Sequence, residues 1–182
     1  MYMKKTALLC LVILIILPVI VYPTACGSPA SNTSIYTNIQ YGFSCEYPDG
    51  WDTDTIIPDV VVSFTGPHIS DMGRAITIMV TAEKSTTFSE LTVEEYRQRA
   101  DTMLSEQLEN YQKLGEQAID VNGVPVIIGQ FSHDVDGTTT KATHAYIKYI
   151  DTIYLIGISA EPEYHDGYYY IFDALVKSMK FE

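Results

Sequence analysis

The sequence predicts an α+β protein in which an antiparallel β-sheet meander is sandwiched between helices. Two observations predict the sheet: short apolar runs with a two-residue period follow one another over residues 112–160, and Asn-Gly or Asp-containing turns separate them. A third observation predicts the helices, because residues 91–108 and 167–178 carry apolar side chains at helical spacing. Some strands are apolar on both faces, and such a sheet has to be covered on both sides.

Four strand signals precede the first of these helices, at residues 35–39, 42–47, 60–65 and 74–81. In the second of them, Phe43, Cys45 and Tyr47 alternate onto one face. The other two cysteines of the chain, at positions 10 and 26, belong to an N-terminal export segment, so no disulfide framework is expected. Cys45 is therefore expected to be a buried core thiol.

The first helix begins with a capping box, because Thr92 can cap the helix and Glu95 can reach back to it. Its predicted apolar face consists of Tyr96, Ala100, Met103, Leu104 and Leu108. We expect this stripe to pack against the core, since apolar side chains at this spacing form the buried face of an amphipathic helix.

The meander follows, with strands predicted at residues 112–121, 124–134, 139–149 and 153–160. Asn122-Gly123 is the strongest hairpin signal of the chain, because both turn positions need a positive φ. Asp136-Gly137 and Asp151-Thr152 are expected to form the next two turns. The last helix is expected near residues 167–178.

The N-terminus predicts a lipoprotein signal peptide over residues 1–25, with a basic start, an apolar run and small residues before Cys26. Cys26 would then carry a diacylglyceryl group, followed by a flexible tether over residues 26–34 and the folded domain over residues 35–182. An uncleaved anchor helix and cleavage without lipid are the alternatives. Each alternative places the domain outside the cytoplasm, and the lipid would hold it at the extracytoplasmic face of the cell membrane.

The charge balance excludes one class of partner. The chain has a formal net charge of −12, and removal of the signal takes away two lysines, which leaves 9 basic against 23 acidic residues. A surface this acidic repels phosphate backbones, so nucleic-acid binding is not expected. It also disfavours flat docking on anionic lipid, which is a further reason to expect a tether.

The segment YGFSCEYPDGW, residues 41–51, resembles the opening of the PsbP-like family, in which a glycine–aromatic pair precedes Tyr-Pro-x-Gly-Trp. A VVVSF strand at residues 60–64, the helix start at 91–100 and a closing KSMKF at 177–181 follow in the family's order. The resemblance implies an α-β-α sandwich. The best-known members are extrinsic subunits of photosystem II, many others are lipoproteins of unknown role, and a nuclear import factor shares the fold. The fold alone therefore does not assign a function.

Histidine and aspartate occur together in three segments that are candidates for binding zinc or a similar divalent ion. The candidate ligands are His68 and Asp71, His133, Asp134 and Asp136, and His165 and Asp166. Solvated polar turns are the alternative, because a closed metal site needs three or four convergent ligands. His133 and His144 are expected on one face of neighbouring strands but too far apart to share an ion.

Tyr169 and Tyr170 belong to a run of tyrosines at the start of the last helix, and at least one should be exposed as a contact for a partner. The sequence has no GxSxG, phosphate-loop, HExxH or CxxC motif, so no enzyme activity and no cofactor are expected. The sequence favours a non-catalytic binding or accessory protein of a membrane complex. A metal-binding module and an uncharacterised enzyme are the alternatives.

Overall fold

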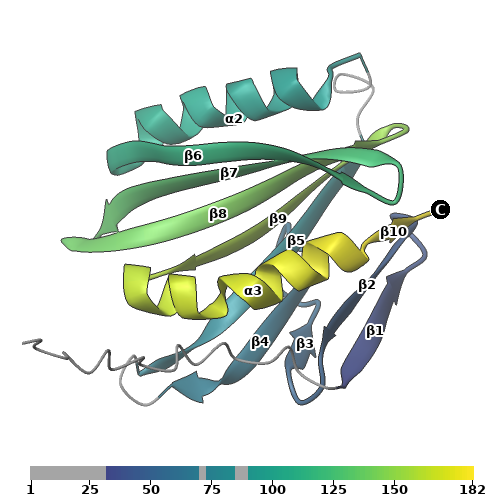
Figure 1. The fold of residues 1–182 in the computed structure, drawn as a ribbon, viewed down its shortest axis with the longest axis horizontal. Coiled ribbons are helices and arrows are strands. Elements are labelled where there is room, and N and C mark those ends of the chain that lie inside the picture. Colours follow the sequence, from purple (N-terminus) through teal and green to yellow (C-terminus); the bar gives the residue numbers. More distant parts are fainter. Residues whose placement is uncertain (1–31, 70–72, 85–89) are drawn as a thin grey trace, which may run out of the picture.

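A seven-stranded antiparallel sheet forms the body of the protein in a computed structural model that describes residues 32–69, 73–84 and 90–182 (Figure 1). Its strand order is β3-β4-β5-β9-β8-β7-β6, and a smaller sheet has the order β1-β2-β10. The large sheet contains β3 (Asp52–Asp54), β4 (Val62–Ile69), β5 (Arg74–Lys84), β6 (Glu109–Val121), β7 (Val124–Val135), β8 (Thr138–Tyr149) and β9 (Thr152–Ala160). The remaining elements are β1 (Thr33–Asn38), β2 (Phe43–Pro48), α2 (Val93–Gln107), α3 (Pro162–Ser178) and β10 (Lys180–Phe181). The predicted α+β class, an antiparallel meander between helices, is confirmed.

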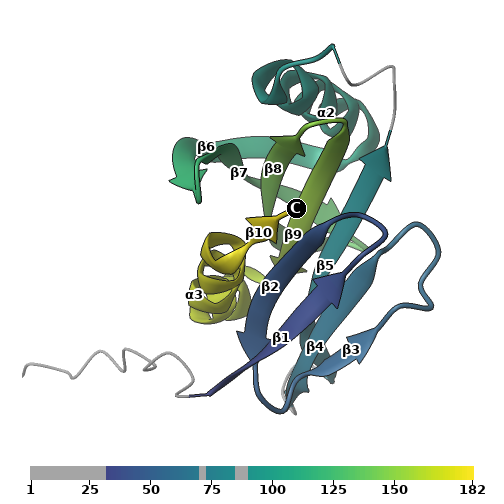
Figure 2. The same ribbon diagram turned by 90° about the vertical axis from the view of Figure 1, so that its right-hand side faces the viewer.

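The two helices lie on opposite faces of the large sheet (Figures 1 and 2). Alternate residues of β8 show this arrangement, since Ala145 and Ile147 join the large core beneath α3, whereas Tyr146 joins a smaller cluster beneath α2. The small sheet closes one end of the large core, where Phe43 packs edge-on against Tyr154. Cys45 is fully buried in this core, as expected, and its burial raises the pKa of the thiol to about 12.

The hairpin predicted at Asn122-Gly123 is present, with φ of 54° and 85° at the two residues. His133 and His144 lie on one face of neighbouring strands but apart from each other, as predicted, because His133 is paired with Thr140 and His144 with Gly129. The turn between β8 and β9 lies one residue earlier than predicted. Ile150 and Asp151 form it and Thr152 begins β9, which leaves exposed Ile150 with a φ of 54° that is unusual for a β-branched residue.

Several element boundaries differ from the prediction, including three early starts. β1 begins at Thr33, β6 begins at Glu109, and α3 begins at Pro162. Proline is well suited to the first turn of a helix, where its missing N–H has no partner to lose, and the sequence pattern alone did not reveal this start. The two register shifts in the β6–β7 pair hid the early start of β6, because each bulge interrupts the alternation.

The capping box of α2 is present, since the Thr92 hydroxyl accepts a hydrogen bond from Glu95 N at 3.2 Å and Thr92 N donates to the Glu95 carboxylate at 2.8 Å. The predicted apolar face is wrong in one respect, because Met103 is 49% exposed whereas Arg97 is buried. A row of residues that includes Val93 and Arg97, four positions apart, faces the sheet, and Met103 falls outside it.

Trp51, the last residue of the YGFSCEYPDGW segment, packs on β4 of the large sheet. Its backbone N–H donates to the Pro48 carbonyl at 3.2 Å across a tight turn, and Gly50 in that turn has a φ of 82°. The indole lies directly over Gly66 of β4, where a Cβ atom would stand 2.8 Å from Trp51 Cζ2. Glycine is therefore required at position 66 because the ring occupies the space of a side chain.

We expect Gly66→Ala to lower the free energy of unfolding by about 1–3 kcal/mol, because the new methyl group would displace the buried indole. Urea denaturation followed by circular dichroism measures this change. Gly115→Ala is the matched control, since a Cβ at Gly115 of β6 would meet no atom within 4 Å. Equal stability of the two variants would contradict the packing of Trp51 on β4.

Candidate functional site

The His68–Asp71 pair is only partly within the described residues. His68 is exposed near the end of β4, where it is paired with Ala75 of β5. Asp71 lies outside the described ranges. Metal binding by this pair therefore stays a prediction.

The side chains of the second candidate metal site, at the β7–β8 turn, do not converge on one point. His133 lies on the α2 face of the sheet, near the ring of Phe131, and Asp134 is directed to the opposite face because strand residues alternate. Asp134 accepts hydrogen bonds from Asn110 Nδ2 at 2.7 Å and from Thr139 Oγ1 at 2.9 Å, and these bonds lower the pKa of its carboxyl. Asp136 is exposed in the turn itself, with a φ of 50°.

His165 and Asp166 are connected through α3 to β8. The buried His165 shares a hydrogen bond with Thr143 Oγ1 through Nε2 at 2.9 Å, and its Nδ1 lies 3.1 Å from Asp166 Oδ1. Lys141 Nζ donates to the same Asp166 oxygen at 2.6 Å. Burial lowers the pKa of His165 and outweighs the opposing effect of its hydrogen bond to Asp166. Both ring nitrogens are thus engaged, and a metal ion would have to displace one of these contacts.

The side chains of Thr143, His165 and Asp166 form a hydrogen-bonded series of hydroxyl, imidazole and carboxylate. A catalytic nucleophile and its base are arranged in the same order. Thr143 and His165 are both fully buried, however, between β8 and α3. A substrate cannot reach Thr143 Oγ1 in this arrangement, so the contacts serve to hold α3 on the sheet. Within the described ranges, no three His, Cys, Asp or Glu side chains gather closely enough to hold a metal ion.

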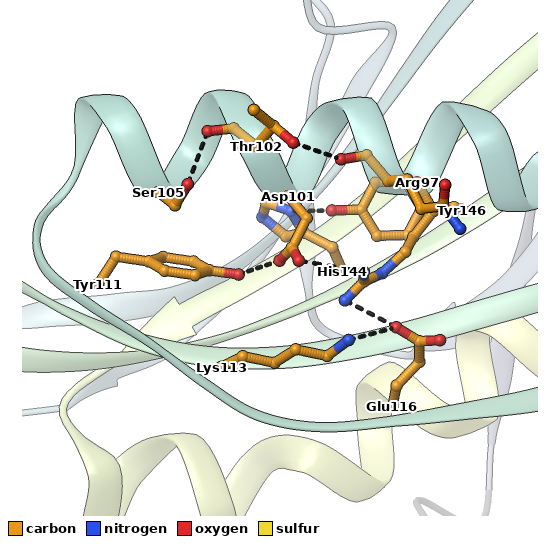
Figure 3. A network of polar contacts seen from close by, with 10 residues as sticks. Arg97, Asp101, Thr102, Ser105, Tyr111, Lys113, Glu116, His144 and Tyr146 are labelled. Carbon is orange, nitrogen blue, oxygen red and sulfur yellow. Dashed lines mark hydrogen bonds and ion pairs between the residues drawn. The ribbon is translucent and has the colours of Figure 1, made fainter.

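A second polar cluster joins α2 to the sheet around the buried side chain of Arg97 (Figure 3). Arg97 lies 2.7 Å from a Glu116 oxygen of β6 and 3.2 Å from an Asp101 oxygen one turn along α2. The Tyr111 hydroxyl donates to Asp101, and Lys113 Nζ donates to Glu116 at 3.0 Å. The guanidinium is thus satisfied by two carboxylates, which fixes α2 over β6, β7 and β8.

His144 lies beside this cluster and faces the part of the sheet that α2 does not cover. Its Nδ1 is 3.3 Å from the Tyr146 hydroxyl, and its ring meets Phe131 edge-on. Gly157 on β9 leaves room for the imidazole, because a Cβ there would stand 3.2 Å from His144 Cδ2. Desolvation, with a smaller contribution from the charge of His133, lowers the pKa of His144 to about 4, so this ring is neutral at pH 7.

His144 forms one wall of a groove of about 370 Å³, which we call the histidine groove. Its lining residues are Arg74, Ala75, Thr77, Met79, Thr81, His144, Leu155, Gly157, Ile158 and Ser159. A larger hollow of about 890 Å³, the tyrosine cleft, is lined by Tyr36, Asn38, Gln40, Tyr41, Thr55, Asp59, Val60, Val61, Thr81, Ala82, Glu83, Tyr96, Ile153 and Leu155. The two hollows share Thr81 and Leu155, so they adjoin along β5 and β9, and we call the two together the furrow.

The tyrosine cleft exists because β4 and β5 pair over only part of their lengths. β4 is paired with β5 up to Val62, opposite Val80, whereas β5 continues along β9 to Lys84. Residues Thr81 to Glu83 therefore form a wall of the cleft. The sequence could not reveal this hollow, since its lining comes from five separate segments and depends on where one strand pair ends.

The opposite wall of the cleft is fixed by the core. The ring of Tyr36 packs against Phe43 and edge-on against Phe64, and its hydroxyl accepts a hydrogen bond from Asn38 Nδ2 at 3.1 Å. Asn38 Oδ1 accepts from Tyr41 N at 2.9 Å, and the Tyr41 carbonyl accepts from the hydroxyl of Tyr154 at 2.6 Å. These contacts order the wall before any ligand arrives, which reduces the entropic cost of binding.

The two tyrosines predicted as partner contacts differ in exposure. Tyr170 is 41% exposed, as expected for at least one of them. Tyr169 is partly buried: it packs on His165 and Phe172, and its hydroxyl accepts a hydrogen bond from Gln117 Nε2 at 3.2 Å. A partner contact at either residue stays a prediction, and so does lipidation of Cys26, which lies outside the described residues.

No model of a known protein family matches this sequence, and no curated protein matches it. Solved structures do match. The solution structure of PsbP (CyanoP) from Synechocystis sp. PCC 6803 is 16% identical, with a TM-score of 0.60 over 86% of this chain and 96% of that chain. LpqN of Mycobacterium tuberculosis, described as involved in cell envelope biogenesis, is 11% identical, with a TM-score of 0.63 over 82% and 90%. The Saccharomyces cerevisiae Ran-binding protein Mog1p is 12% identical, with a TM-score of 0.57 over 82% and 95%.

These likenesses bear out the PsbP-like resemblance at the level of the fold, which is PsbP/Mog1-like. At such identities they show nothing of the site. None of the helices in the described ranges is both long and apolar enough to cross a lipid bilayer.

We expect the protein to lose stability as the pH falls from 7.5 to 5. The folded-state pKa of His144 is about 4 and that of His165 is also lowered, so the unfolded chain binds protons more readily in this range. His144 alone accounts for a loss of about 2 kcal/mol in the free energy of unfolding at pH 5. Urea denaturation at both pH values measures the loss.

His144→Gln should reduce this pH dependence, whereas His68→Gln, at an exposed position, should leave it unchanged. An unaltered pH dependence in His144→Gln would contradict the neutral, desolvated state of this ring.

Proposed function

We propose that this protein is a membrane-tethered extracytoplasmic lipoprotein that acts as a non-catalytic binding or accessory protein of a membrane complex. Its partner is held at the tyrosine cleft. The single observation that carries this proposal is the cleft itself, an open hollow of about 890 Å³ with one wall fixed by Tyr36, Asn38 and Tyr41. Ordered clefts of this size are the usual sites of ligand and partner recognition.

The contrast between the cleft and the buried histidine supports binding over catalysis. The Thr143–His165–Asp166 chain has the elements of a nucleophilic site but no access for a substrate. The cleft has access, but the described residues that line it include no histidine, cysteine or serine. What it offers is tyrosine, amide and carboxylate side chains, which recognise a partner by hydrogen bonds and stacking.

The proposed location rests on residues 1–26 and on where the fold begins. β1 starts at Thr33, so six residues separate it from Cys26, and the seven residue-to-residue steps span at most about 25 Å. A diacyl anchor on Cys26 would hold the domain permanently within this distance of the membrane. An envelope role is also stated for LpqN, which has the same fold.

We expect Cys26→Ser to release the protein from the membrane fraction, because the thiol that would receive the diacylglyceryl group is lost. Fractionation of cells, with mass spectrometry of the N-terminal peptide, measures both anchoring and lipid. Ser31→Ala, in the same segment, should stay in the membrane fraction. Retention of Cys26→Ser at the membrane would show that another anchor holds the domain.

We expect Thr81→Trp to abolish capture of the native partner, because an indole at the junction of cleft and groove would fill the furrow. The measurement is a pull-down of C-terminally tagged protein from gently solubilised native membranes, read by quantitative mass spectrometry. The expected loss is at least tenfold. Thr37→Trp, on the exposed side of β1, is the control and should capture the partner normally. Undiminished capture by a folded Thr81→Trp variant would refute the cleft as the binding site.

A further inference from the structure

The charges that line the tyrosine cleft are all of one sign. Asp59 and Glu83 contribute carboxylates, and none of the lining residues in the described part of the chain is a lysine or an arginine. Glu83 and Tyr96 line the same hollow, and the pKa of the Tyr96 hydroxyl is raised by desolvation and further by the charge of Glu83. Unlike Glu116, which is paired with Arg97 and Lys113, neither carboxylate has a salt-bridge partner among the described residues.

Three tyrosines accompany these carboxylates. Tyr36, Tyr41 and Tyr96 all line the cleft, and the first is held rigidly by Phe43 and Phe64. Carboxylates attract an ammonium or guanidinium group, and the faces of aromatic rings attract it further. Tyrosine hydroxyls and the Asn38 amide can accept the remaining donors of such a group. The chemistry of the lining therefore suits an organic cation.

Exposed isoleucines stand next in sequence to lining residues of the cleft on two loops. Ile39 lies between the lining residues Asn38 and Gln40 and is 92% exposed, and Ile56 follows the lining residue Thr55 and is 87% exposed. The next residue, Ile57, is also exposed. Exposed isoleucines on both loops beside one hollow are unfavourable in water, unless a partner covers them. A free amine or polyamine would leave these isoleucines uncovered, whereas a protein surface would bury them.

We propose that the tyrosine cleft receives a lysine or arginine side chain of a partner protein, with apolar residues beside that side chain covering Ile39 and Ile56. This inference rests on the proposed function and specifies the chemistry of the partner. The inserted cation would be the anchor of the interface, surrounded by an apolar rim that excludes water from the charge pair. Such a pair would also steer the acidic domain toward a basic patch on its partner.

The test uses the full-length mature protein in mild detergent and fluorescence anisotropy with labelled decapeptides. One peptide carries a central lysine flanked by leucines, and its matched partner carries glutamine in place of the lysine. We expect the lysine peptide to bind at least tenfold more tightly and to weaken as salt rises. Glu83→Gln and Ile39→Ser should each weaken its binding at least fivefold. Glu163→Gln, on an exposed turn of α3, and Leu114→Ser, on exposed β6, are the matched controls.

Equal binding of the two peptides would overturn the inference, and so would an equal loss in Glu83→Gln and Glu163→Gln, which would indicate a general charge effect. If spermidine bound as tightly as the lysine peptide and Ile39→Ser had no effect, the ligand would be a free organic cation. That result would overturn the inference that a protein side chain occupies the cleft. In these cases the proposed function still stands if Thr81→Trp loses the native partner. Normal capture by Thr81→Trp would instead remove the proposed function and this inference together.

Discussion

The buried guanidinium of Arg97 determines how the rest of the surface is arranged. A charge removed from water needs partners, and Arg97 finds them in Asp101 of its own helix and Glu116 of the edge strand β6. This pairing fixes α2 over β6, β7 and β8 and leaves β5 and β9 open on the same face. The furrow lies on this open part of the sheet. On the other face, α3 and the small sheet cover the large core.

The pairing of Arg97 with Glu116 also explains which parts of the fold could be predicted from the sequence. Local signals were sufficient for the capping box of α2 and for the Asn122-Gly123 hairpin, because each depends on residues close together in the chain. The two-sided apolar pattern of the sheet correctly predicted helices on both faces. It did not predict that α2 covers only part of its face, since this depends on Arg97 meeting Glu116 across 19 positions of sequence. An arginine within an apolar stripe, four residues before an aspartate, was the signal that could have indicated a buried charge.

The candidate site was harder to predict than the fold for the same reason. His165 had a visible sequence signal in its neighbour Asp166, but its engagement with Thr143 depends on α3 packing against β8. The cleft had no local signal at all, because it is built where β4 leaves β5 and where two loops approach the start of α2. Histidine and aspartate residues can be identified as candidate ligands from the sequence, whereas a hollow between tyrosines can be identified only once the strand register is known.

The position of the cleft along β1 connects its geometry with the proposed tether. The chain enters the fold at Thr33, whereas the cleft is lined by Tyr36 and Asn38 toward the other end of this six-residue strand, about 10 to 17 Å away. A domain anchored through residues 26–32 would therefore present the cleft away from its point of attachment. Its net negative charge would also keep it from lying flat on an anionic membrane. Both effects leave the acidic cleft open to a neighbouring protein rather than to lipid, which is the arrangement that an accessory protein of a membrane complex requires.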